Sequence, residues 1–124
     1  MSDQRKVVVV LGASPNPDRY SNRAIKMLVQ AGHHVIPVHP LLESVEGLSV
    51  VHQLDQISEA VDTLTVYVNS ERLLLLLDSI QILKPKRVIL NPGTESPTAI
   101  EKLTAAGIQV LPACTLVLLS TGQW

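Results

Sequence analysis

The chain has 124 residues and a formal net charge of −1, with 46% hydrophobic but only 2% aromatic residues. This length predicts one domain, residues 1–124, with a single core packed mainly by Val, Leu and Ile. Charges of both signs are interspersed, which argues against nucleic acid or an acidic membrane surface as a partner. The single cysteine, Cys114, excludes an internal disulfide and a cysteine-rich metal site.

The N-terminal residues Met1 to Lys6 are polar or charged and lead directly into an apolar run, so we expect no secretory signal. No apolar run approaches the roughly 18–20 residues that cross a bilayer. We therefore expect a cytoplasmic protein with no membrane partner.

Five apolar runs bounded by turn residues predict strands, at residues 7–11, 35–38, 63–68, 87–90 and 109–111. Amphipathic segments at 21–30, 71–83 and 97–106 predict the helices between them. Gly32 and Gly107 follow the first and third of these segments, where glycine commonly ends a helix. This alternation predicts a Rossmann-like, doubly wound α/β/α domain with a mainly parallel sheet of about five strands.

Residues 39–60 form the one long interruption of the alternation. A Glu46-Gly47 turn predicts an extended excursion. Leu54, Ile57 and Ala60 at helical spacing then predict a short helix that returns the chain to the third strand. Long loops at the carboxyl ends of strands commonly serve a ligand or cover a sheet edge.

The predicted helix at 71–83 carries more leucine than one core-facing side requires. Its stripe comprises Leu73, Leu76, Leu77, Ile80 and Leu83, whereas Leu74 and Leu75 fall outside it. Contiguous exposed leucines commonly mark an interface, so the favoured interpretation is a homodimer contact through the helix from Leu73 to Leu83. The alternative is an apolar but solvated helix. We expect the apolar residues 115–124 to dock on the domain or on a second subunit.

The first strand is followed by the loop Gly12 to Ser21, which leads into the first helix. In such a unit the backbone N–H groups of the loop and of the first helical turn are expected to be unpaired and to attract phosphate. Asp18 is the expected N-cap residue, or Ser21 if the helix starts later, and Arg19 supplies a nearby cation. The alternative is a loop that turns the chain and binds nothing.

The glycine loop departs from the dinucleotide fingerprint G-x-G-x-x-G, which also needs an acidic residue at the end of the second strand. Only Gly12 is present, because Ser14 and Pro17 occupy the other two positions. The second strand ends in Val38-His39-Pro40, without an acid. This pattern argues against ordinary NAD binding and favours a nucleotide whose 3′-phosphate an acid would repel.

The most specific motifs are Gly-Ala-Ser-Pro-Asn-Pro-Asp-Arg-Tyr-Ser-Asn at residues 12–22 and Ile-Pro-Val-His-Pro at 36–40. With Glu46-Gly47, Asn91-Pro92-Gly93 and Cys114, they resemble the small single-domain CoA-binding proteins. That family is similar to the CoA-binding domain of the succinyl-CoA synthetase α subunit and of ADP-forming acyl-CoA synthetases. The resemblance covers nearly the whole chain, from Val7 to about Cys114.

The resemblance implies a binding site for CoA or acyl-CoA, with four groups of residues around it. Along the phosphates it places Gly12, Ala13, Ser14 and Asn16, and along the ADP or pantetheine it places Arg19, Tyr20 and Ser21. Beside the adenine it places Pro37, Val38, His39 and Pro40, and on the opposite lip it places Val68, Asn91, Pro92 and Gly93.

Two segments depart from the family pattern. Residues 67–70 read Tyr-Val-Asn-Ser where the family often carries a run ending in an aromatic residue and Arg or Lys. His39 stands where the family commonly has Asn, which preserves hydrogen bonding but changes its geometry.

Other candidate groups lack partners. His33 and His34 are adjacent at a strand start and point to opposite faces, and His39 and His52 have no carboxylate or cysteine at ligand spacing, so no metal is expected. Ser14 lacks the G-x-S-x-G context of a nucleophile. A buried, inert thiol is the favoured interpretation of Cys114, and the alternative is a thiol that meets the CoA sulfhydryl or senses redox state.

No catalytic set is evident in the sequence, so the prediction is a CoA-binding or acyl-CoA-binding module that acts as a carrier, a sensor or a subunit. Two alternatives remain open. One is an NAD(P)-binding, oxidoreductase-like subunit, and the other is an oligomeric interaction module without a ligand.

Overall fold

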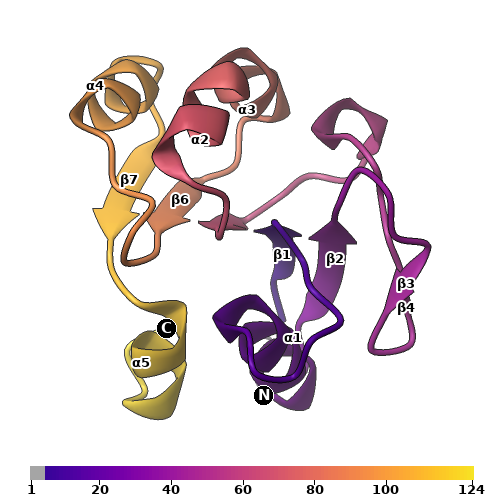
Figure 1. Ribbon diagram of the computed structural model, residues 1–124. Helices are drawn as coiled ribbons and strands as arrows, with labels where there is room; N and C mark the ends of the chain where they lie inside the picture. The colour runs from indigo at the N-terminus through magenta and orange to yellow at the C-terminus, as the bar shows by residue number, and fades with distance from the viewer. Residues whose placement is uncertain (1–4) are drawn as a thin grey trace.

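A five-stranded parallel sheet forms the centre of the computed structural model, which describes residues 5–124 (Figure 1). Across the sheet the strands are β2 (His34–Val38), β1 (Val7–Leu11), β5 (Thr63–Val66), β6 (Arg87–Leu90) and β7 (Gln109–Pro112). The chain passes from β1 to β2 on one side and later continues from β5 on the other side. The strand order therefore reverses between β1 and β5, which is where open α/β sheets bind their ligands.

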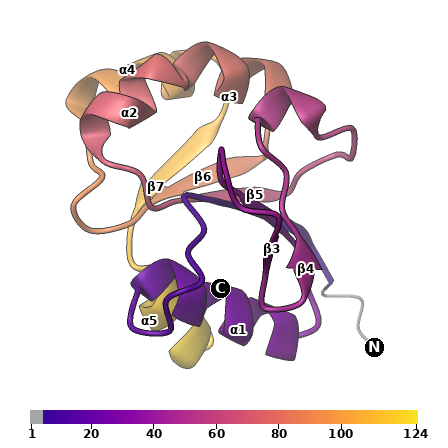
Figure 2. The same cartoon turned by 45° about the vertical axis from the view of Figure 1, so that its right-hand side comes forward.

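Helices cover both faces of the sheet (Figure 2). α1 (Tyr20–Gln30) and α5 (Thr115–Ser120) lie on one face, and α2 (Ser70–Leu75), α3 (Leu77–Leu83) and α4 (Pro97–Ala105) lie on the other. Because successive strand residues point to opposite faces, Val8 and Val10 pack in one apolar cluster and Val9 and Leu11 pack in the other. The unbroken apolar run of β1 thus serves two buried faces, and the predicted doubly wound α/β/α fold is confirmed.

The predicted helix at 71–83 is two helices rather than one. The backbone N–H of Leu76 donates to the Leu73 carbonyl, three residues back instead of four, so α2 closes tightly and α3 starts afresh at Leu77. Leu73, Leu77 and Ile80 are buried as predicted, whereas Leu75 is 84% exposed. The third strand also ends at Val66, earlier than predicted.

The excursion after β2 covers the outer edge of that strand. Its hairpin joins β3 (Ser44–Val45) to β4 (Leu48–Ser49) through Glu46 and Gly47, whose positive φ angles of 51° and 78° suit a tight hairpin turn. Val51 then donates to the Pro37 carbonyl at 2.9 Å. The predicted short helix is only the 3₁₀ turn η1 (Leu54–Gln56), because the chain is extended again at Ile57.

The C-terminal residues dock on the domain, which is one of the two possibilities that the sequence left open for residues 115–124. α5 packs beside α1, and the Trp124 ring lies under the Arg87 guanidinium at 4.4 Å from the ring centroid. Trp124 also joins the apolar cluster that contains Val8 and Val10. None of the helices within residues 5–124 is long and apolar enough to cross a membrane.

Candidate functional site

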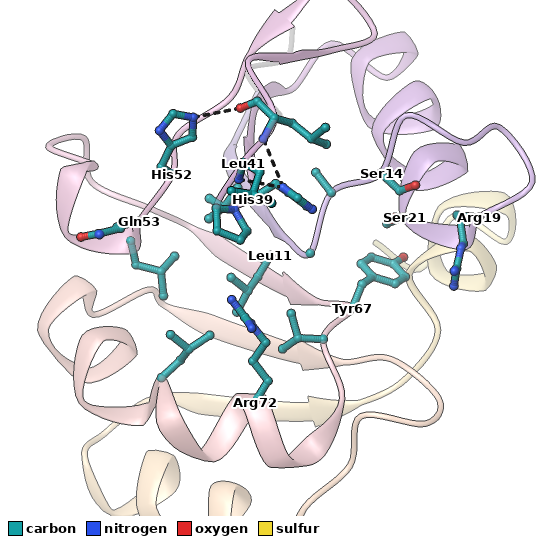
Figure 3. Close-up of a pocket in the computed structure, with 18 of the residues that line it drawn as sticks. Leu11, Ser14, Arg19, Ser21, His39, Leu41, His52, Gln53, Tyr67 and Arg72 are labelled. Atoms are coloured by element: carbon teal, nitrogen blue, oxygen red, sulfur yellow. Dashed lines mark hydrogen bonds between the residues drawn. The ribbon is translucent and has the colours of Figure 1, made fainter.

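A cavity of about 1040 Å³ opens where β1, β2 and β5 end (Figure 3). Leu11 and Gly12 come from the end of β1, Val38 comes from the end of β2, and Tyr67 and Val68 follow β5. The cavity therefore sits at the topological switch point of the sheet, and its volume suits a ligand of cofactor size.

The loop after β1 is anchored at its base to the end of β2. The Val38 carbonyl accepts hydrogen bonds from the backbone N–H groups of Gly12 at 3.1 Å and Ala13 at 3.0 Å. Gly12 has a φ of 95°, and a Cβ there would come within 3.1 Å of the Tyr67 carbonyl carbon and of Val68 Cγ1. The expectation that the loop amides are unpaired is thus wrong for these two, which hold the loop in place, and it is also wrong for the N–H groups of Asn16, Asp18 and Arg19.

Side chains of the loop fix the rest of its path. Ser14 Oγ accepts from the Asn16 N–H at 3.1 Å, and Asn16 Oδ1 accepts from the Asp18 N–H at 2.9 Å. The buried Asn22 amide donates to the Ser14 carbonyl at 2.9 Å and to Glu46 Oε2 at 3.1 Å. These bonds tie the loop to α1 and to the β3–β4 hairpin.

The N-terminus of α1 is open towards the cavity. Arg19 is the N-cap residue and its side chain makes no capping bond, so the predicted capping by Asp18 or Ser21 is wrong. The reason is the turn that Asn16 makes with the Asp18 N–H, after which the helix begins at Tyr20. Within residues 5–124 no acceptor covers the backbone N–H groups of Tyr20, Ser21 and Asn22. This end of the helix therefore attracts an anion.

Two arginines line the cavity from different sides. Arg19 belongs to the loop, and Arg72 extends from α2 towards the floor of the cavity near Leu11 (Figure 3). Neither guanidinium forms an ion pair with a carboxylate in the described part of the chain. Asp18 and Asp55 also line the cavity, so its wall carries both signs of charge.

Two histidines hold the turn that forms the far wall. His39 Nδ1 accepts from the backbone N–H groups of Leu41 at 3.0 Å and Leu42 at 3.2 Å. Since Nδ1 is an acceptor, the ring proton of His39 lies on Nε2, and no acceptor among residues 5–124 takes it. His52 Nε2 lies 3.0 Å from the Leu42 carbonyl, to which it donates, and 3.7 Å from Glu43 Oε2.

Tyr67 lies below Ser14 and Ser21 in the view of Figure 3. Its hydroxyl is buried and has no hydrogen-bond partner among residues 5–124. Burial raises the pKa of Tyr67 to about 12, although the nearby hydroxyls of Thr115 and Thr65 oppose part of the rise. Those two hydroxyls bond to each other at 2.8 Å.

Most of the site residues expected from the sequence meet in this cavity. Those that line it are Gly12, Ala13, Ser14, Arg19, Tyr20, Ser21, Val38, His39, Pro40 and Val68. The structure does not bring Asn16, Pro37, Asn91, Pro92 or Gly93 into the lining. Cys114 is partly buried just before α5 and does not line the cavity either. Whether its thiol is reactive stays a prediction.

Sequence reasoning missed the walls supplied by the excursion and by α2 and α3. The additional lining residues are Leu11, Pro15, Asp18, Leu41, Leu42, His52, Gln53, Leu54, Asp55, Tyr67, Arg72, Leu76 and Ser79. The length of the excursion at the carboxyl end of β2 was the available signal for the far wall. For the described residues, no group of three or more His, Cys, Asp or Glu side chains is placed to hold a metal ion.

Comparisons with known proteins agree with this fold. A family model described as a CoA binding domain matches residues 6–120. A crystal structure of an uncharacterized protein is 40% identical and superposes with a TM-score of 0.92, over 98% of this chain and 100% of that one. The uncharacterized protein YneT of Bacillus subtilis is 35% identical over 68 residues, which is 55% of this chain and 50% of YneT. The matched segment thus spans only half of that relative's length.

A larger enzyme contains the same fold. The dinucleotide-forming acetyl-coenzyme A synthetase 1 of Ca. Korarchaeum cryptofilum superposes with a TM-score of 0.75 over 87% of this chain. The match covers 25% of the synthetase chain at 19% identity, so it shows a shared fold alone.

Proposed function

Because this chain belongs to the CoA-binding domain family, we propose that it binds CoA or acyl-CoA in the cavity at the carboxyl ends of its strands. The observation that carries the proposal is the uncapped N-terminus of α1, which faces the cavity beside Arg19. Unpaired backbone N–H groups next to a guanidinium suit a diphosphate. The cavity volume of about 1040 Å³ also suits a ligand as large as CoA.

Different residues of the cavity bind different parts of the proposed ligand. Its diphosphate lies against the N–H groups of Tyr20 and Ser21, with Arg19 as the counter-charge. Its adenine lies beside Val38 and Pro40, within reach of the Nε2–H of His39. The loop is held by bonds inside the protein, so ligand binding needs little ordering of this segment.

We propose a non-catalytic role, in which the protein carries or senses CoA or its esters or serves as one subunit of a larger assembly. Within residues 5–124, no lining serine or tyrosine hydroxyl is hydrogen-bonded to a histidine or a carboxylate, as the nucleophile of an acyl transfer would be.

Thermal unfolding tests the proposal, with CoA, acetyl-CoA, NAD, NADP and ATP each in large excess. A ligand at 100 times its dissociation constant adds about 2.7 kcal/mol, which shifts the unfolding temperature by several degrees. We expect a shift with CoA and acetyl-CoA that Arg19→Gln reduces. Lys86→Gln is the matched control, because it removes one exposed charge just before β6, at the other end of the sheet.

A shift with NAD or NADP alone would support the oxidoreductase-like alternative. The absence of any shift would support the ligand-free interaction module. Equal shifts in wild type and Arg19→Gln would remove Arg19 from the site.

We also propose that α2 and α3 make a homodimer contact. Leu75 and Ile82 are 84% and 81% exposed, and Leu74 is 42% exposed. Leu75→Glu would lower the mass measured by light scattering, whereas Val29→Glu on α1 would leave it unchanged. A monomeric wild type would refute the contact.

A further inference from the structure

Two cations on different walls of one cavity are free of internal partners. Arg19 and Arg72 both line it, and neither takes part in an ion pair or a side-chain hydrogen bond within residues 5–124. An arginine fork presents several donors in a plane and suits a phosphate oxygen pair. A cavity with two such forks fits a ligand that has two separate anionic groups.

The position of Arg72 is set by the start of α2. Asn69 Oδ1 accepts from the Arg72 backbone N–H at 2.8 Å, which caps the helix and fixes the Arg72 backbone. From there the side chain extends over the cavity floor near Leu11 (Figure 3). Arg72 therefore lies across the floor from the α1 N-terminus and from Arg19.

The end of β2 carries no acid that would repel a phosphate on the ribose. β2 ends in Val38, and His39 and Pro40 follow it. The Nε2–H of His39 is a donor, as the two bonds to Nδ1 require. Asp55, which follows in the excursion after β2, is a carboxylate that lines the cavity. Among the described residues it forms no ion pair with Arg19 or Arg72.

We propose that Arg72 binds the 3′-phosphate of the nucleotide while Arg19 and the α1 N-terminus bind the 5′-diphosphate. This inference rests on the proposed function and adds a specificity to it. Arg72 selects CoA and its esters over adenine nucleotides that lack a 3′-phosphate.

Calorimetric titration of two ligands, CoA and 3′-dephospho-CoA, tests the assignment. Wild type binds CoA at least about 10-fold more tightly, since a hydrogen-bonded charge pair is worth that much or more. Arg72→Gln weakens CoA binding by about 10- to 100-fold and dephospho-CoA binding by less than about 3-fold. Arg72→Lys keeps the charge without the fork and gives an intermediate preference.

Two controls accompany the titration. Lys102→Gln removes an exposed charge on α4 and leaves both affinities unchanged. Thermal unfolding without ligand shows whether each variant folds as the wild type does.

The outcomes separate this inference from the proposed function. If Arg72→Gln weakens both ligands equally or neither, or if wild type does not distinguish them, the 3′-phosphate assignment is overturned and CoA binding stands. If wild type binds neither ligand, both the inference and the proposed function are overturned.

Discussion

The backbone N–H of Thr115 donates to Asn91 Oδ1 at 2.9 Å, although 24 residues separate them in the chain. The Nδ2 of Asn91 donates to Thr65 Oγ1 at 2.7 Å and to the Val66 carbonyl at 2.8 Å. Asn91 therefore ties the end of β6 to β5 and to the start of α5. Its side chain is buried, and its hydrogen-bonding capacity is used within the protein.

Asn91→Ala removes three buried hydrogen bonds and should lower the free energy of unfolding by about 3 kcal/mol. Urea denaturation measures this loss, with Gln109→Ala, an exposed change on β7, as the control. The CoA affinity of the folded variant should change by less than about 3-fold, because Asn91 does not line the cavity. A large loss of affinity with unchanged stability would return Asn91 to the binding site.

Gly12→Ala should destabilise the protein more than Gly107→Ala. Both glycines have positive φ, 95° and 86°, so both substitutions incur a similar backbone strain of about 1 kcal/mol. Only at Gly12 does a Cβ meet other atoms, at 3.1 Å, and the resulting crowding should add about 1–3 kcal/mol. Denaturant unfolding of the two variants measures the difference. Equal losses in the free energy of unfolding would show that Tyr67 and Val68 move away from the new Cβ without destabilising the protein.

His39→Ala should loosen the far wall, because the N–H groups of Leu41 and Leu42 lose their acceptor. We expect a loss of about 1 kcal/mol in stability and weaker CoA binding. His39→Asn offers a side-chain acceptor for a backbone N–H two residues on, so it should recover most of the stability. It lacks the Nε2–H that reaches the adenine, so the CoA affinity should stay low. Thermal unfolding and titration of the two variants check this. If Asn restores the CoA affinity together with the stability, then the ring does not contact the ligand.

Tyr67 should make stability fall at alkaline pH. Its folded pKa of about 12 lies above the ordinary value of 10.0, so its contribution is complete below pH 10 and is lost as the pH rises towards 12. Two pKa units correspond to about 2–3 kcal/mol over that range. Denaturation of wild type and Tyr67→Phe at pH 9 to 12 measures it, with Tyr20→Phe as the control. Parallel curves for wild type and Tyr67→Phe would contradict the raised pKa.

The sheet could be predicted because β1, β2, β5 and β6 are buried on both faces and so read as short apolar runs, whereas the edge strand β7 is only partly buried. Residues 7–11 and 87–90 match their strands to the residue. The break at Leu76 could not be predicted, because apolar residues continue across it and no Gly or Pro marks it. Likewise, the cap of α1 could not be predicted, because the chain still turns at Asn16 to Asp18 and the helix begins only at Tyr20, which leaves Arg19 as the N-cap residue.

The part of the candidate site that could be predicted is the part formed by β1 and the loop that directly follows it. Arg19 and Ser21 stand in a local pattern of strand, loop and helix that sequence alone reveals. Arg72 comes from a helix 50 residues away, and only the pairing of β5 with β1 brings it to the same cavity. Asn91 is a polar residue after a strand, as many ligand-binding residues are, and only the position of α5 shows that it bonds internally.

Amide chemical-shift mapping with CoA on the ¹⁵N-labelled protein tests the central claim, which is that the ligand lies with its diphosphate at the start of α1. The account predicts the largest shifts at the amides of Tyr20, Ser21 and Asn22, with further shifts near His39 and Arg72. The amides around Arg87 and Trp124, at the amino ends of the strands, should not move. A second, smaller groove is lined by residues of β2, β4 and the segment after η1, among them His34, Ile36 and Glu59. Shifts confined to the amino ends of the strands, or to this second groove, would contradict the account.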